Sequence, residues 1–403
     1  MKLLVLSFDY YPDSGVGSFR TMALMEQLLK MQRDDIKIDL ITTMHNQEGY
    51  FSPETCELEH YGQLRIRRIP IPKHHPGFWG QGWAFFLYAR QVRKIVQYEK
   101  YKVVYASSSR LMMASLAAWI ARRQKAILFL DIRALFVDTL GEVLPKYVAR
   151  FVKPWFAKLE HWTLAAAQHV NLMSQGFQSY VQQRFSDKKL TYYPHGIDND
   201  FLQGGFQSIN HASEQFTILY VGHIGDGQGL ECIVPQLAKL LEGCAQIKIM
   251  GNGPRKPQLE AAIMLCPNVA LLPVAQGDAL IQAYTEADLL FLHLHDTHVF
   301  RKILPSKLFE YAATGKPILA GVAGYAAEFI QAEITNAMVF QPGHAELACK
   351  AISQLDFVVH PREVFIKKYQ RDELMQKMAM ELIAYFSRPT SPSLRAQRRD
   401  PVV

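Results

Sequence analysis

Arg301–Pro317, with the sequence RKILPSKLFEYAATGKP, is the stretch that best predicts the fold of this chain. It follows the apolar run ADLLFLHL, contains a short amphipathic helix that ends at Gly315, and leads into the apolar run ILAGV. A strand, a helix and a second strand in this order indicate a parallel sheet whose helix begins at the carboxyl edge. Free backbone N–H groups and the positive end of the helix dipole favour an anion there.

Three side chains of this stretch indicate which anion. Ser306 is expected to cap the helix start, and Lys307 places a cation beside it. Glu310, one turn further on, is suited to accept hydrogen bonds from a pair of ribose hydroxyls. A phosphate site beside a ribose site suggests that a nucleotide sugar binds. An ordinary strand–helix–strand unit with solvated charges would contain the same residues, so the rest of the chain must decide.

Composition narrows the class of protein. The chain has 403 residues, 49% of them hydrophobic, which suits two or three domains with buried cores. Its net charge of +7 favours anionic partners, but no helix-turn-helix, zinc-finger or RNA-recognition pattern supports binding of nucleic acid. The five cysteines are scattered, so we expect free thiols in a reducing compartment.

The ends and the hydrophobic runs bear on localisation. The N-terminus MKLLVLSFDYY reads as a buried first strand and not as a signal peptide. No apolar run reaches the roughly 20 residues that span a bilayer. We therefore expect a cytoplasmic protein, with the inner face of the cell membrane as a further location.

Apolar segments alternate with helical segments along the whole chain, which predicts an α/β protein built from parallel sheets. The expected strands are KLLVLSF, KIDLIT, LRIRRIPI, KVVYAS, AILFLDI, HVNLMS, KLTYYP, FTILYVG, QIKIMG, VALLPV, DLLFLHL, PILAGV and AMVF. We expect Rossmann-like domains at 1–195 and 196–360. A helix at 361–387 should pack back on the first domain, and the basic tail 388–403 should be disordered.

Glycine-rich loops follow three of the expected strands. DYYPDSGVGSFR ends the first strand and has Arg20 where a dinucleotide fingerprint has its third glycine, and we expect this cation to bind the donor. GHIGDGQG and GNGP follow strands of the second half. The glycines expected to lie against a ligand are Gly15, Gly17, Gly222, Gly225, Gly251 and Gly253. A tight turn without ligand explains each loop alone, but together they favour a phosphate site.

These motifs together resemble the family 4 retaining glycosyltransferases of the GT-B fold, over about residues 1–385. The matching segments are GVGS, HGID, GHIGDGQG, GNGP, AD-x-L-F-L, and LPSKLFEY with the following GKP. The likeness is greatest to bacterial members that build cell-surface polysaccharide, the O-antigen and capsule subgroup. It implies sugar transfer from a nucleoside-diphosphate sugar, without a metal or other cofactor, in a cleft between two Rossmann-like domains.

The chain departs from the family at the diphosphate site. Many members hold the diphosphate with an Arg and a Lys in the loop where this chain has His223 and Gln228. Many also carry two Glu residues, of which the second, the ribose ligand, matches Glu310 and the first falls on Lys302. We infer that Arg301, Lys302 and Lys307 supply the missing charge. His293 or His295, at the end of a strand, is expected to contact the sugar or phosphate.

Catalytic roles fall on the segment FLDIRALF of the first half, because family members carry a His near the reacting carbon there. Arg133 is nearest to that position and is expected to bind a phosphate. Asp131 is expected to orient the acceptor or to stabilise an oxocarbenium-like centre; a salt bridge between the domains is the alternative. With Lys307 and Glu310 they form the predicted catalytic set. The clusters HLHDTH and DND imitate metal sites, but we expect no metal.

Two stretches mix aromatic and basic residues. Lys73–Lys94 contains Phe78, Trp79 and Trp83, and Leu144–Trp162 contains Trp155. Such mixtures suit contact with a membrane surface that carries anionic lipid, although a helix core with solvated charges gives the same pattern. Both stretches lie in the acceptor-binding half of the family fold, which favours a lipid-linked acceptor.

The functional expectation is a retaining glycosyltransferase. Resemblance favours a UDP-sugar over a GDP-sugar as donor, and a glycan or polyprenyl-diphosphate-linked acceptor in surface-polysaccharide synthesis. Two alternatives stay open: a catalytically silent nucleotide-sugar-binding scaffold and a GT-B sugar epimerase. The sequence does not identify the sugar, the acceptor, the linkage or the oligomeric state.

Overall fold

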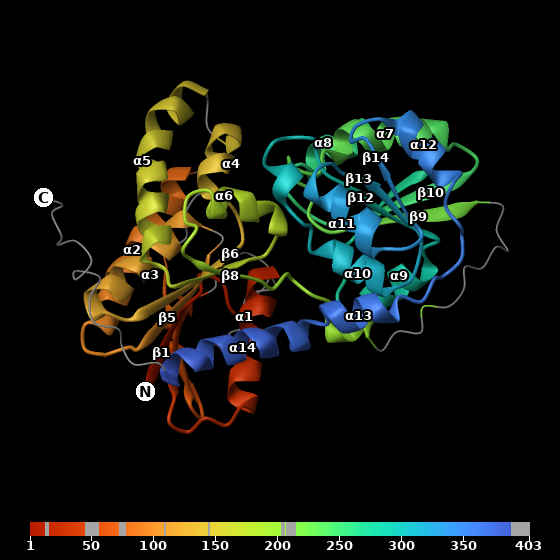
Figure 1. Cartoon of the computed structure of the whole chain (residues 1–403). Coiled ribbons are helices and arrows are strands. Elements are labelled where there is room, and N and C mark those ends of the chain that lie inside the picture. Colours follow the sequence, from red (N-terminus) through yellow and green to blue (C-terminus); the bar gives the residue numbers. More distant parts are fainter. Residues whose placement is uncertain are drawn as a thin grey trace, which may run out of the picture. The chain divides into compact units, whose positions relative to one another are not determined.

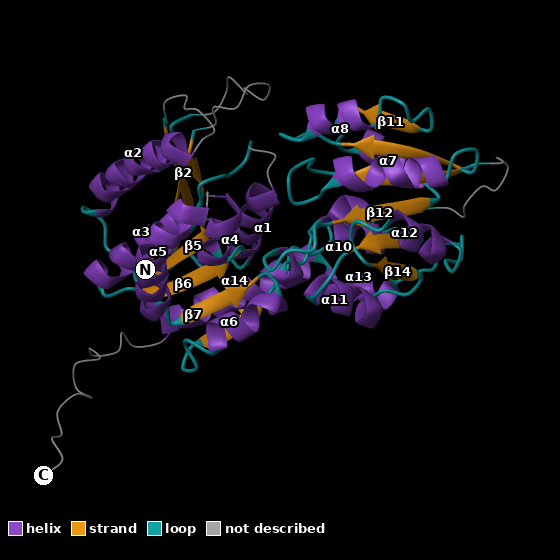
Figure 2. Cartoon of the chain, turned by 90° about the horizontal axis from the view of Figure 1, so that it is seen from above, coloured by secondary structure: helices purple, strands orange, loops and turns teal. Residues whose placement is uncertain are grey.

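The computed structural model describes residues 1–12, 16–44, 56–71, 78–108, 110–143, 146–202, 206 and 215–387. The chain divides into two compact units. Unit 1 comprises Met1–Leu172, Gln182–Thr191 and Met375–Val403, and unit 2 comprises Met173–Val181 and Tyr192–Leu374. Each unit has a largely parallel sheet covered by helices on both faces (Figures 1 and 2), so the predicted α/β class is confirmed.

The sheet of unit 1 has the order β3-β4-β2-β1-β5-β6-β7-β8. Its strands are β1 (Lys2–Leu6), β2 (Lys37–Thr43), β3 (Leu58–Tyr61), β4 (Leu64–Ile69), β5 (Val103–Ser108), β6 (Ile127–Ile132), β7 (His169–Leu172) and β8 (Lys189–Tyr192). The edge strand β3 pairs antiparallel with β4 and was not predicted. Its sequence LEHY is mostly exposed and lacks the apolar run by which the other strands were recognised.

Helices cover both faces of this sheet. They are α1 (Val16–Lys30), α2 (Phe78–Val96), α3 (Leu111–Gln124), α4 (Phe136–Val143), α5 (Lys146–Ala166) and most of α14 (Arg371–Ser387). Helix α1 lies on one face of the sheet, and α2, α3 and α5 lie on the other (Figure 1). Right-handed crossovers explain this arrangement, because α1 connects β1 to β2 in one direction along the sheet whereas the other three helices connect strands in the opposite direction. Helix α3 packs directly against α5.

The sheet of unit 2 has the order β11-β10-β9-β12-β13-β14. Its strands are β9 (Phe216–Val221), β10 (Ala245–Met250), β11 (Val269–Leu272), β12 (Leu289–His293), β13 (Ile318–Gly321) and β14 (Ala337–Phe340). Two apolar clusters, one on each face, bury the sheet. The helices are α7 (Leu230–Leu240), α8 (Lys256–Ala262), α9 (Asp278–Glu286), α10 (Lys307–Ala313), α11 (Tyr325–Glu333), α12 (Ala345–Ile352) and α13 (Glu363–Tyr369).

The segment expected to form a single helix at 361–387 consists of two helices. Helix α13 ends at Tyr369 and α14 begins at Arg371, with extended backbone at Gln370, where Ile197 forms an isolated bridge. The division between the units falls within α14, after Leu374. The predicted tail 388–403 lies outside the described residues.

Short segments α6 (Gln178–Gln182), η1 (Gln175–Phe177), η2 (Asn199–Phe201) and η3 (Phe300–Lys302) complete the helical elements. None of the helices within the described ranges is long and apolar enough to cross a membrane.

Candidate active site

The backbone of the glycine loop Gly222–Gly229 in unit 2 approaches Gly251 and Gly253 too closely for a side chain on either of these two glycines. A Cβ atom on Gly251 would lie 1.9 Å from the carbonyl oxygen of Gly222, and one on Gly253 would lie 2.2 Å from that of Ile224. The loop after β9 and the turn after β10 therefore meet backbone to backbone, which only glycine permits. This contact places the start of the loop at the carboxyl edge of the sheet.

Lys307 reaches this loop from the first position of α10. Its Nζ atom donates a hydrogen bond to the Tyr220 hydroxyl at 2.6 Å and lies 3.8 Å from the centroid of that ring. A Cβ on Gly222 would lie 2.7 Å from the same Nζ, so the missing side chain makes room for the ammonium group. Among the described residues no carboxylate forms an ion pair with Lys307.

Burial without a counter-ion weakens the positive charge of Lys307. Desolvation lowers the pKa of its ammonium group from 10.5 to about 7, and the Glu310 carboxylate offsets only part of this effect. A diphosphate at this position would supply the missing negative charge. The structure thus places Lys307 beside the glycine loop, and its role in holding an anion stays a prediction.

Glu310 lies one turn further along α10 and keeps part of its carboxylate available. One oxygen accepts a hydrogen bond of 3.0 Å from the Tyr284 hydroxyl. The other has no hydrogen-bond partner within the described part of the chain, and the side chain is partly exposed. Burial raises the pKa of Glu310, while Tyr284 and the nearby Arg371 act in the opposite direction. The free oxygen suits a sugar hydroxyl.

The two other cations predicted to hold the diphosphate are engaged elsewhere. Arg301 makes a bidentate ion pair with Asp296, with Nη2 2.8 Å from Oδ2. The Lys302 ammonium lies 5.4 Å from the ring centroid of Tyr180. The expectation of three cooperating cations is therefore corrected, because Lys307 is the member of this set that contacts the glycine loop.

His293 is not available to the donor, contrary to expectation. It is fully buried; its Nε2 accepts a hydrogen bond from the backbone N–H of Gly343, and its Nδ1 lies 2.6 Å from the carbonyl oxygen of Gln228. Nδ1 must therefore carry the proton, and burial lowers the pKa of the ring to about 4. The neutral ring ties the glycine loop to β12 and to Gly343.

His223 and Ser306 remain open to a ligand. His223 is exposed within the glycine loop, and its pKa is lowered by desolvation and by Lys307, so the ring is neutral at pH 7. Ser306 occupies the N-cap position of α10 but forms no capping hydrogen bond, which corrects the predicted cap. Because α10 has only seven residues, we attribute the local positive potential to Lys307 rather than to the helix dipole.

In unit 1, Asp131 and Arg20 form a buried ion pair. Arg20 Nε and Nη2 lie 2.7 and 3.1 Å from the two carboxylate oxygens of Asp131. Tyr105 and Asn171 donate further hydrogen bonds of 2.9 and 2.7 Å to the same carboxylate. Both charged groups are buried, so Arg20 is not the ligand-facing cation that was expected. Asp131 therefore forms a salt bridge within unit 1, and not between the domains as the alternative expected.

Arg133, which follows β6, lacks such partners. Its Nε is buried without a hydrogen-bond partner among the described residues, and desolvation lowers the pKa of the guanidinium. A Cβ atom on Gly17 would lie 2.0 Å from Nη1, so Gly17 lets Arg133 reach the first turn of α1. The buried hydroxyls of Ser18 and Ser107 likewise have no hydrogen-bond partner in the described ranges. Gly15 lies outside the described residues.

The segments HLHDTH and DND, which resemble metal-binding motifs, form no metal centre in the part of the chain that the structure describes. No three His, Cys, Asp or Glu side chains gather there in a way that could hold an ion. Asp198 of the DND segment binds Arg371 and precedes the short 3-10 helix η2, which contains the other two residues of the segment.

Sequence reasoning missed three residues around Lys307 and Glu310. Tyr220 and Tyr284 hold these two side chains, and Arg371 acts on the charge of Glu310 from another helix. Nothing in the local sequence distinguishes these two tyrosines and this arginine from other Tyr and Arg residues of the chain. Only the alternation of strand and helix, which places Tyr220 near a strand end, gave a hint.

Comparisons with known proteins agree with this architecture. The model of a glycosyl transferase 4-like domain matches residues 20–196, and that of the glycosyl transferases group 1 matches residues 215–356. No curated protein matches the sequence. The fold and these domains define a two-domain glycosyltransferase of the GT-B type. The chain belongs to the glycosyltransferases, and its expected enzymatic class is confirmed.

Solved structures share the fold across nearly the whole chain. Sucrose-phosphate synthase from Thermosynechococcus elongatus is 13% identical, with a TM-score of 0.67, and the match covers 96% of this chain and 99% of that one. HepE from Anabaena, in complex with UDP, is 14% identical, with a TM-score of 0.64 and coverages of 95% and 100%. A UDP-forming trehalose-phosphate synthase from Burkholderia xenovorans, in complex with glucose-6-phosphate, is 11% identical, with a TM-score of 0.65 and coverages of 95% and 100%.

Proposed function

We propose that this glycosyltransferase is a retaining enzyme that takes a sugar from a UDP-sugar bound by unit 2. The acceptor is a glycan or a polyprenyl-diphosphate-linked sugar, and the setting is surface-polysaccharide synthesis at the inner face of the cell membrane. The observation that carries the proposal is Lys307, a half-buried cation that has no carboxylate partner among the described residues and lies against Gly222 at a strand end. HepE, a structural neighbour, was solved with UDP.

Different residues of this site bind different parts of the donor. The backbone of the Gly222–Gly229 loop and the Lys307 ammonium hold the diphosphate, and the free oxygen of Glu310 accepts hydrogen bonds from the ribose. His223 and Ser306 lie beside this site as further hydrogen-bond groups. No metal takes part in this proposal.

Transfer breaks the bond between the anomeric carbon and the diphosphate oxygen. Negative charge then grows on the leaving UDP, where Lys307 and the loop N–H groups stabilise it. The acceptor hydroxyl forms the new bond on the same face of the sugar and passes its proton to the departing phosphate oxygen. This route conserves the anomeric configuration.

The acceptor site is proposed in unit 1, with Arg133 as the ligand of a phosphate group. A buried guanidinium Nε without a partner is costly unless an anion satisfies it when substrate binds. A polyprenyl diphosphate offers such a group, as does a phosphorylated sugar like the one bound to the Burkholderia xenovorans neighbour. Asp131 fixes Arg20, Tyr105 and Asn171 around the preceding strand and acts as a positioning residue.

The test is thermal stabilisation by UDP, GDP and ADP at equal, saturating concentrations. A ligand at about 100 times its dissociation constant adds roughly 2.7 kcal/mol to the stability of the site that binds it. We expect UDP to raise the unfolding temperature more than GDP or ADP. A panel of UDP-sugars with polyprenyl-diphosphate-linked and phosphorylated sugars then identifies the reaction by release of UDP.

Other outcomes would select the alternatives. UDP binding without turnover on any acceptor, and without interconversion of UDP-sugars, would favour a binding scaffold. Conversion of one UDP-sugar into its epimer without an acceptor would show an epimerase. No stabilisation by any nucleotide would contradict the donor site itself.

A further inference from the structure

The positive charge of this protein is concentrated on one helical layer of unit 1. Helices α2, α3 and α5 together contain nine Lys and Arg residues and a single acid, Glu160, which is buried. Their net charge of +8 exceeds the +7 of the whole chain. The rest of the protein is therefore close to neutral, and attraction to anions is local to this layer.

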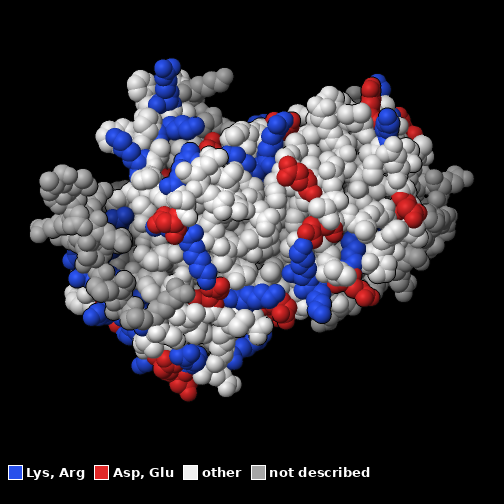
Figure 3. Space-filling model, in the orientation of Figure 1, with Lys and Arg blue, Asp and Glu red and all other residues white. Residues whose placement is uncertain are grey.

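Large aromatic side chains are exposed on the same helices. Trp83 and Phe86 of α2 are 60% and 54% exposed and stack with ring centroids 5.5 Å apart. On α5, Tyr147, Phe151 and Trp155 are spaced by four residues and are each more than 70% exposed. Figure 3 shows Lys and Arg gathered at the upper left, over the region of α5. Phe78 and Trp79 begin α2, but their side chains lie outside the described set.

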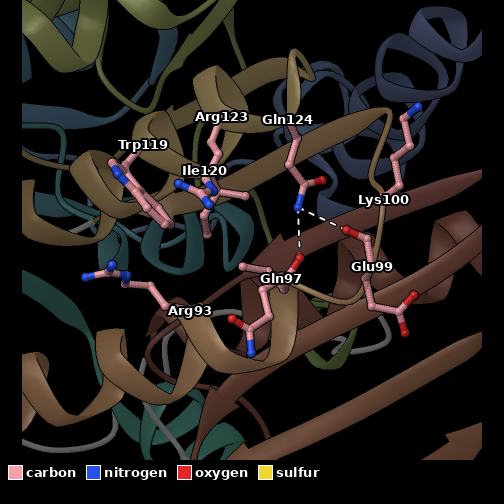
Figure 4. A pocket seen from close by; sticks show the side chains of 9 residues that line it. Arg93, Gln97, Glu99, Lys100, Trp119, Ile120, Arg123 and Gln124 are labelled. Atoms are coloured by element: carbon pink, nitrogen blue, oxygen red, sulfur yellow. Dashed lines mark hydrogen bonds between the residues drawn. The ribbon is translucent and has the colours of Figure 1, made fainter.

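A groove runs between α2 and α3 at the end of this aromatic face. Two adjoining pockets of about 300 and 490 Å³ form it, and the larger one begins at Phe86. The cations along the groove are Arg90, Arg93, Lys94, Lys100 and Arg123. Figure 4 shows the side chains of Arg93 and Arg123 with Trp119 beside one another at one of these pockets.

Within the part of the chain that the structure describes, these cations have no acidic partners. Among the described residues, Arg90, Arg93, Lys94 and Arg123 form no ion pair; the guanidinium carbons of Arg93 and Arg123 lie 4.8 and 5.6 Å from the Trp119 ring. The nearby acid of the groove, Glu99, is already paired with Lys2 and Arg65. The groove is thus lined by unneutralised charge that an anion would stabilise.

We propose that the groove between α2 and α3 binds the phosphate headgroups of anionic phospholipids. The adjoining stripe of Trp83 and Phe86 follows the same face of α2 and suits the interface between headgroups and acyl chains. A soluble phosphate would not account for exposed aromatic rings that continue the groove. This inference rests on the proposed membrane location and names the surface and the lipid chemistry responsible for it.

The test is co-flotation of the full-length protein with phosphatidylcholine vesicles, with and without phosphatidylglycerol, at constant ionic strength. Arg93→Glu combined with Arg123→Glu should weaken partition to phosphatidylglycerol vesicles at least about a hundredfold, because each cation near an anionic surface contributes about a factor of five and two charges are reversed. Vesicles of phosphatidylcholine alone should bind every variant weakly.

A matched control is Lys239→Glu combined with Lys350→Glu. Both lysines are exposed on helices of unit 2, and the substitutions change the net charge by the same amount. We expect the control to lose less than about threefold in partition. Equal losses in both double variants would mean that only net charge matters and would overturn the proposal.

Two further arms separate the sources of phosphate and the two proposals. Glycerol 1-phosphate at the total concentration of phosphatidylglycerol should leave the protein on the vesicles; full release would overturn a lipid-surface site. UDP-induced thermal stabilisation should be the same in both double variants and the unsubstituted protein. Loss of vesicle binding with an intact UDP response thus tests this inference alone, whereas failure of UDP to stabilise any of them contradicts the donor site.

Discussion

Lys307 and Glu310 lie one helical turn apart, yet they act on different parts of the proposed donor. The Lys307 ammonium lies against Gly222 at the loop, whereas the Glu310 carboxylate is held by Tyr284 on another helix. Lys307 offers a ligand its positive charge, and Glu310 offers a carboxylate oxygen that can accept a hydrogen bond. Substitution of each should therefore affect different ligands.

Lys307→Ala should weaken binding of both UDP and inorganic pyrophosphate, whereas Glu310→Ala should weaken UDP only. A hydrogen bond to a charged group contributes about 1.5–3 kcal/mol, which predicts losses of roughly 10- to 150-fold in affinity. Isothermal titration calorimetry with both ligands measures them. Lys302→Ala is the control and should bind both normally. Equal loss of pyrophosphate binding in the Glu310 variant would contradict the division of roles.

The affinity for UDP should fall as the pH rises above about 7. The pKa of Lys307 is lowered to about 7 in the free protein, and a bound diphosphate favours the protonated form and raises this pKa again. Binding then takes up a proton, so the dissociation constant rises by up to tenfold per pH unit above 7. Titrations between pH 7 and 9 test this, and a Lys307→Ala variant should show a flat profile. A flat profile in the unsubstituted protein would mean that Lys307 stays charged without ligand.

At the scale of elements, the Asp131 network joins four parts of unit 1. Arg20 comes from α1, Tyr105 from β5, Asp131 from β6 and Asn171 from β7. Because the pair is buried, its charges depend on each other and on hydrogen bonds from the surrounding side chains. The network therefore fixes the end of β6 and, with it, the position of Arg133, which follows this strand.

Arg20→Met should lower the free energy of unfolding of unit 1 by about 3–5 kcal/mol, because it leaves the Asp131 carboxylate buried without its cation. Urea denaturation, followed by a probe in each unit, measures the loss. The double variant with Asp131→Leu removes both charges and should recover part of the stability. If the double variant were as unstable as the sum of the single ones, the buried charge would not be the cause.

The two sheets have glycine–cation contacts of the same kind. In unit 2 the Lys307 ammonium occupies the space that a side chain on Gly222 would fill, and in unit 1 the Arg133 guanidinium does so at Gly17. Both contacts lie where strands of a parallel sheet end, the usual place for ligands in such folds. The elements thus provide one anion-binding candidate in each unit.

At the scale of the whole molecule, the two candidates predict ligand effects in different units. UDP should slow backbone hydrogen exchange in Gly222–Gly229 and at the start of α10, both in unit 2. A polyprenyl diphosphate of short chain should slow exchange in the first turns of α1, in unit 1. Exchange measured by mass spectrometry with each ligand alone separates these effects. Protection of α1 by UDP and not by the acceptor would assign Arg133 to the donor.

The fold and the class of enzyme were predictable because their signals are local. Buried parallel strands need near-continuous apolar runs, and the chain shows them at β1, β5, β9 and β12. Lys307 and Glu310 could be proposed as site residues because their spacing on one short helix can be read directly from the sequence. The exposed strand β3 gave no such signal and was missed.

The partners of charged and polar side chains were decided only by the tertiary structure. Arg20 meets Asp131 across 111 positions of sequence, and His293 meets Gly343 across 50. Such contacts depend on how strands are ordered in a sheet, and no local pattern records that order. The sequence by itself therefore determined the fold class, the glycine loops and the presence of cations near them. Only the folded chain decided that Arg20 and Arg301 are neutralised by acids while Lys307 and Arg133 pair with none of the described acids. Burial and long-range pairing set the charge that remains for a ligand.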